Sequence, residues 1–115
     1  RELSYVHPKI KGGDISYEGV IQTTGGWGKI NTYGPKLVEN IVQATSRDCL
    51  AEAIKRLEIA NFPVVFHVHD EVICEVPIGK SSPEEIRRIM AKPIDWAPGL
   101  ILNADAYECA FYRKD

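Results

Sequence analysis

The longest regular pattern of apolar positions lies in the first half of the chain, where apolar residues recur every three or four positions. This spacing places them on one side of an α-helix and predicts a helix over residues 35–60. Pro35 suits the first helical position, where a missing N–H does no harm, and Asn61 followed by Phe62-Pro63 predicts the end of the helix. The apolar side consists of Val38, Ile41, Val42, Thr45, Cys49, Ala53 and Leu57.

Shorter apolar runs rich in β-branched residues predict strands before and after this helix. They lie near residues 15–22, 29–33, 64–68, 72–76 and 100–112. Gly12-Gly13 predicts a turn before the first of them, and Ser82-Pro83-Glu84-Glu85 has the pattern of a helix start, so a short helix should run to about Met90. The elements together predict an α+β fold, with an antiparallel sheet, the long helix packed on one face and the short helix closing a side.

Composition narrows the classes of protein. With 115 residues, 44% hydrophobic and 26% charged, the chain is sized and composed like one soluble domain. A net charge of −2 without a charged tail requires any nucleic-acid surface to be a local patch. No apolar run approaches the roughly 20 residues of a membrane span. Three widely spaced cysteines predict free thiols in a reducing cytoplasm. The sequence starts at Arg1 and its single methionine is Met90, which predicts that the chain is part of a longer protein.

A polar triplet, His69-Asp70-Glu71, separates two apolar β-branched runs and predicts a hairpin with adjacent carboxylates at its tip. Ionised carboxylates lose hydration in a buried strand, so this pair lies in solvent, meets a cation or holds a metal ion. Magnesium prefers such oxygen ligands, and phosphoryl transfer by two metal ions needs carboxylates that hold the ions about 4 Å apart. The plain alternative is a solvated acidic turn.

Two histidines, His67 and His69, stand two positions apart, the spacing that places side chains on one face of a strand. Such a pair can bind zinc if a third ligand is near, and Glu75 or Cys74 are the nearby candidates. The alternative is that His67 is a packed sheet residue and that His69 hydrogen-bonds a phosphate or an acid.

A polar stripe follows the predicted long helix, because Lys36, Asn40, Gln43 and Arg47 recur at intervals of four, three and four. Amide and guanidinium donors can bond the acceptors that every base pair presents in the DNA minor groove. Such a stripe would contact a duplex without reading its sequence. The alternative is a solvated helix face, and Glu39 beside the stripe dilutes its positive charge.

Four segments occur together and in a fixed order: residues 33–44, 47–48, 67–72 and 95–100. Together they resemble the C-terminal part of the palm of family A DNA polymerases, the DNA polymerase I group, and in particular its bacteriophage and prophage branch. The resemblance implies that Asp70 is the metal-binding aspartate of motif C and that Glu71 is an assisting acid. It also places His69 near the primer terminus and Gln43 in the minor groove, with Asn40 three residues before it, where the bacterial enzymes have an asparagine four residues before.

Where the bacterial enzymes of this family have an arginine earlier on the helix, this chain has only Lys36 nearby. Arg47 is a further candidate contact to DNA. The resemblance implies template-directed addition of a deoxynucleotide to a primer 3′-hydroxyl with two Mg²⁺ ions, in the cytoplasm of a bacterial or phage-infected host. The partners would be primer–template DNA and dNTP. The motif A aspartate, the fingers helix and the thumb are missing, so we expect the isolated chain to be inactive and to self-associate.

Two alternatives come from other classes of protein. A non-catalytic duplex-binding or complementing module of a split polymerase would carry the same segments. A small zinc-binding protein built on His67 and His69 is the third hypothesis.

Overall fold

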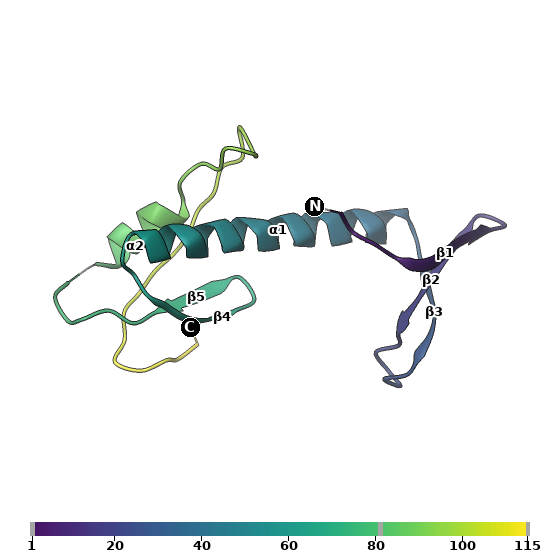
Figure 1. Ribbon diagram of the computed structural model, residues 1–115, viewed down its shortest axis with the longest axis horizontal. Helices are drawn as coiled ribbons and strands as arrows, with labels where there is room; N and C mark the ends of the chain where they lie inside the picture. The colour runs from purple at the N-terminus through teal and green to yellow at the C-terminus, as the bar shows by residue number, and fades with distance from the viewer. Residues whose placement is uncertain (1, 81, 115) are drawn as a thin grey trace. The chain divides into compact units, whose positions relative to one another are not determined.

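The computed structural model describes residues 2–80 and 82–114 and has the α+β fold that the sequence predicts (Figure 1). In chain order its elements are β1 (Val6–Lys11), β2 (Asp14–Val20), β3 (Trp27–Thr32), α1 (Gly34–Ile59), β4 (Val64–Val68), β5 (Glu71–Cys74) and α2 (Pro83–Met90). The chain divides into two compact units, Arg1–Thr45 and Ser46–Asp115, and α1 contributes to both.

The first unit contains a three-stranded antiparallel sheet in the order β1-β2-β3. Gly12 and Gly13 join the first two strands with φ angles of 58° and 87°, and Lys11 pairs with Asp14 on either side of them. Tight two-residue hairpin loops of this kind need positive φ at both positions, which glycine adopts at no steric cost. The predicted turn at this position is confirmed.

Helix α1 ends in a way that the sequence indicates. Asn61 has a φ of 67°, the N–H of Phe62 donates to the carbonyl of Leu57 at 2.9 Å, and the N–H of Asn61 donates to the carbonyl of Glu58 at 3.1 Å. These two bonds satisfy carbonyls that would otherwise lack a partner, and a contact between the flanking apolar residues commonly accompanies them. Both Phe62 and Leu57 are buried. The helix therefore ends within a residue of its predicted end.

The second unit is built around an apolar core. Its members are Leu50, Ala53, Leu57, Phe62 and Ile94. Arg56 of α1 donates to the carbonyl oxygens of Lys92 and Pro93, at 2.8 and 2.7 Å, and so fixes the segment that brings Ile94 into this core. The apolar side of α1 is covered only over this part, because Val38, Ile41 and Val42 in the first unit are each more than half exposed.

Two details of the predicted sheet are wrong. The strands form two separate sheets, β1-β2-β3 and β4-β5, and residues 100–112 contain no strand in the described part of the chain. Residues such as Asn103, Ala104 and Ala106 favour strands weakly and blur the alternation that a strand needs. This segment instead contacts the hairpin through its aromatic rings, since Tyr112 lies edge-on to Phe66 with centroids 5.2 Å apart.

Helix α2 begins as predicted. Ser82 is its N-cap, with the side-chain oxygen accepting a bond from the N–H of Glu85 at 3.4 Å, and Pro83 follows in the first turn. Neither α1 nor α2 has the combination of length and apolar character that crossing a membrane requires.

Candidate functional site

The acidic turn is a two-residue loop between β4 and β5. Val68 pairs with Glu71, which leaves His69 and Asp70 as the loop, and His69 has a φ of 54°. Asp70 is exposed, whereas Glu71 is half-buried as the first residue of β5. The two predicted carboxylates are thus adjacent, but only Asp70 lies in the loop itself.

The donors at this turn are carboxylate oxygens, the ligand type that Mg²⁺ prefers. Within residues 2–80 and 82–114, no group of three or more His, Cys, Asp and Glu side chains is placed to hold a metal ion. Mg²⁺ usually keeps several waters and binds proteins through one or two carboxylates together with substrate phosphates. Asp70 and Glu71 therefore fit such an ion by chemistry and number, as partial ligands that need further oxygens from elsewhere.

Helix α1 contacts strand β4 at two points. Near the start of the strand, the N–H of Val64 donates to the Glu58 carboxylate at 2.8 Å. Near its end, the Arg47 guanidinium lies against the imidazole of His67, with Nη1 at 3.1 Å from Nδ1 and Nη2 at 3.4 Å from Nε2. The strand that leads into the acidic turn is therefore attached to the helix by side chains on both sides of its midpoint.

The base of the hairpin carries the thiol of Cys74, which pairs with Val64 across the two strands. Burial raises the pKa of this thiol, and the nearby Glu58 carboxylate raises it further because a second negative charge there is unfavourable. The thiol is therefore held in its neutral, weakly nucleophilic form.

The arrangement around His67 bears on the zinc hypothesis. Both ring nitrogens of His67 lie against a guanidinium, which is a permanent cation and offers no lone pair. A metal ion at His67 would have to displace Arg47. The structure gives no support to a zinc site built on His67 and His69.

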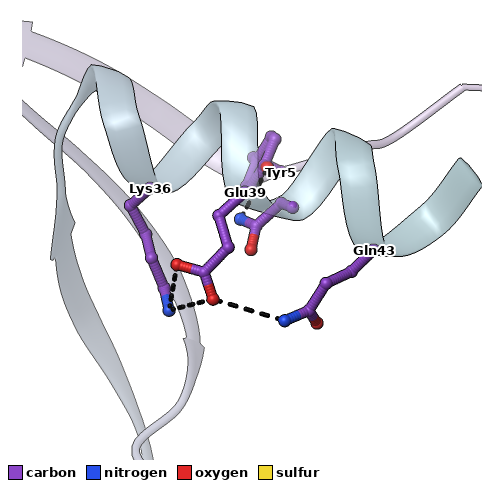
Figure 2. A network of polar contacts seen from close by, with 5 residues as sticks. Tyr5, Lys36, Glu39 and Gln43 are labelled. Carbon is purple, nitrogen blue, oxygen red and sulfur yellow. Dashed lines mark hydrogen bonds and ion pairs between the residues drawn. The ribbon is translucent and has the colours of Figure 1, made fainter. Parts of the chain in front are cut away.

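The polar stripe on the first half of α1 is organised around an acidic residue (Figure 2). Lys36 Nζ lies 3.3 Å from both carboxylate oxygens of Glu39, and Gln43 Nε2 lies 3.3 Å from Glu39 Oε1. Two of the predicted DNA-contacting side chains therefore already donate to a carboxylate on the same helix. All of these groups are exposed, so the contacts exchange readily with water.

Asn40 has a different partner. Its amide donates to the hydroxyl of Tyr5 at 3.1 Å in a partly buried position, and the Tyr5 ring lies edge-on to Tyr17 at 4.9 Å. The amide of Asn40 thus joins α1 to the segment before β1. The four predicted members of the stripe are divided among three partners: Glu39, Tyr5 and His67.

Comparison with known proteins gives one strong likeness. Over 121 aligned positions the chain is 47% identical to a DNA polymerase of Bacillus phage SP02. The similarity extends over the full length of this chain, which spans 18% of that polymerase. No protein-family model matches the chain. No solved structure matches it.

Three contacts of the site were not predicted from the sequence: Glu39 as the centre of the stripe, His67 as the partner of Arg47, and Glu58 at the base of the hairpin. Glu39 had a local signal, because it stands three residues after Lys36 and four before Gln43, the spacings at which helical side chains meet. The contacts of His67 and Glu58 join residues of the helix to a strand and have no such signal in the sequence.

Proposed function

We propose that this chain is the C-terminal palm segment of a family A DNA polymerase of the phage type, and that it works as part of that larger enzyme. The observation that carries the proposal is the 47% identity to a phage DNA polymerase along the whole of this chain. The acid-bearing loop between β4 and β5 supports it, because nucleotidyl transfer needs exposed carboxylates at a fixed position. The complete enzyme would act on primer–template DNA and dNTP in the cytoplasm of its host.

The acidic turn is the catalytic part of this proposal. Asp70 and Glu71 would hold Mg²⁺, with the exposed Asp70 carboxylate as the main ligand, and further ligands would come from the rest of the polymerase. Bound Mg²⁺ stabilises charge on phosphoryl oxygens and helps to activate the attacking oxygen. His69, beside Asp70 in the loop, would lie near the primer terminus, where its imidazole can bond a phosphate or an acid.

The first half of α1 supplies the duplex contact. Gln43, Lys36 and Asn40 would hold the primer–template, chiefly through donors that reach the minor-groove acceptors common to all base pairs. The Gln43 amide carries two N–H donors, and its contact with Glu39 uses one of them. Contacts of this kind hold a duplex in position and carry little sequence information.

The decisive experiment replaces Asp70 in the full-length polymerase that contains this segment. We expect Asp70→Asn to abolish primer extension while duplex binding, measured by fluorescence anisotropy, is kept. Asp105→Asn removes the same charge from the exposed C-terminal segment and serves as the control with normal extension. Normal extension by Asp70→Asn would refute the proposed role of the turn.

A second experiment tests the duplex contact. Gln43→Ala should weaken primer–template binding by a similar factor on substrates of unrelated sequence, because the acceptors it would reach are the same in every base pair. Binding is measured on a panel of duplexes that differ only around the primer terminus. A pronounced change in sequence preference would contradict minor-groove contact by Gln43.

A further inference from the structure

We propose that Arg47 is a positioning residue for the acidic turn: it holds His67 and thereby sets the direction in which β4 presents Asp70. The inference rests on the proposed polymerase function, and it gives Arg47 a role toward the protein instead of the role toward DNA that the sequence suggests. It is carried by the contacts between α1 and β4 in the second unit.

The two attachment points fit one geometry. Glu58 and Arg47 are eleven positions apart on α1 (58 − 47 = 11), about three turns of 3.6 residues, so both lie on the same side of the helix. Their partners Val64 and His67 follow in the opposite order, so β4 runs back along α1. Arg47 and Glu58 are about 16 Å apart along the helix, whereas Val64 and His67 are about 10 Å apart along the strand. The long arginine and glutamate side chains can bridge this difference of about 6 Å.

The chemistry of the contact favours arginine over other cations. A guanidinium only donates, so the His67 ring takes part as the acceptor, with its Nδ1 at 3.1 Å from one guanidinium nitrogen. The second guanidinium nitrogen lies 3.4 Å from Nε2 and fixes the plane of the group relative to the ring. A lysine ammonium at the same place would offer a single point of contact and no such plane.

The contact acts on the turn because very little chain separates them. His67 pairs with Val72, and Asp70 is three residues further along, in a loop of only two residues. The neighbouring residue Phe66 points to the opposite face of the strand, where it packs against Tyr112. Helix α1 on one face and the C-terminal segment on the other therefore restrain the strand that ends at Asp70.

The test is a double-mutant cycle in the full-length polymerase, with Arg47→Ala, His67→Ala and the double variant. We expect each single variant to lower kcat by about tenfold, with the KM for dNTP nearly unchanged, and the double variant to be no slower than either one. Arg47→Lys should remain as slow as Arg47→Ala. Arg88→Ala removes an exposed arginine of α2 and is the control with normal kcat.

The competing role for Arg47 makes a different prediction. If its guanidinium neutralised a DNA phosphate, Arg47→Ala would weaken primer–template binding and reduce the slope of log K against log salt by about one. That result would overturn the positioning role. So would a double variant whose loss of kcat equals the product of the losses in Arg47→Ala and His67→Ala. Asp70→Asn in the same assay distinguishes the two proposals. If this variant extends primers normally, the proposed function fails. If it is inactive but the effects of Arg47→Ala and His67→Ala are independent of each other, only the positioning role is refuted.

Discussion

Each of the two units of this chain is stabilised internally, and the interactions that stabilise the first differ from those that stabilise the second. The second unit has five buried apolar residues, contributed by α1 and by the segments after it. In the first unit, within the described residues, the one buried residue is Ser16, and apolar side chains such as Tyr17 and Leu37 line an open cavity of about 430 Å³. The first unit therefore depends mainly on its strand ladder, whereas the second has a core that can hold the acidic turn between β4 and β5 in a fixed position.

The division passes through a single helix. Leu50, Ala53 and Leu57 on the second half of α1 are buried, but Val38 and Ile41 on the first half are exposed although they continue the same apolar spacing. The same sequence pattern thus has two outcomes in one helix. Periodicity identifies the side that can be buried, and the presence of a partner decides whether it is.

The largest expected effect concerns the core. Leu57 is fully buried, so Leu57→Ala should lower the free energy of unfolding by about 3 kcal/mol through lost burial and the cavity left behind. Val38→Ala, at a side chain that is 59% exposed, should change it by less than about 0.5 kcal/mol. Urea denaturation measures both. Equal effects would mean that the two halves of α1 are supported alike.

A smaller effect is expected at Glu39, whose carboxylate accepts from Lys36 and Gln43. Glu39→Gln removes a negative charge from the proposed duplex-binding face and loosens both donors, so primer–template affinity should rise about threefold, as expected for exposed ion pairs. Glu52→Gln, which removes the charge of a half-buried carboxylate that pairs with the exposed Lys55 on the same helix, is the control. Weaker binding by Glu39→Gln would show instead that Glu39 orients these donors toward DNA.

The smallest expected effect is chemical and lies in the second unit. Because the pKa of Cys74 is raised, its thiolate forms only at higher pH, and iodoacetamide should alkylate it more slowly than the exposed Cys109. Glu58→Gln removes the smaller of the two causes and keeps an acceptor for the Val64 N–H, so Cys74 should react faster yet still lag behind Cys109. Mass spectrometry of partly alkylated protein measures both rates. An unchanged alkylation rate of Cys74 in Glu58→Gln would mean that the Glu58 carboxylate does not affect the reactivity of the thiol.

The elements that the sequence predicts well are those fixed by local chemistry. The turn at Gly12-Gly13, the end of α1 at Asn61 and the Ser82 cap each depend on one or two residues with a specific backbone preference. The hairpin around Asp70 belongs to the same group, because β-branched runs flank its loop. All of these are confirmed.

The features that the sequence does not predict depend on contacts between distant residues. A strand over residues 100–112 needs a pairing partner, and the segment instead uses Tyr112 to pack on Phe66. The position of the Arg47 guanidinium likewise depends on where β4 lies relative to the helix. Helical spacing predicts the face from which Arg47 projects, but not which of the available partners it contacts. The roles of the site residues in catalysis and in DNA binding stay predictions.

One consequence follows from the backbone of His69. Its φ of 54° lies in the left-handed region, which costs an L-residue about 1 kcal/mol relative to glycine. A glycine would make the loop easier to form but would remove the imidazole next to Asp70. Folding and the proposed role of His69 near the primer terminus thus make opposite demands at this position, and glycine is the residue expected here in a variant selected only for thermostability.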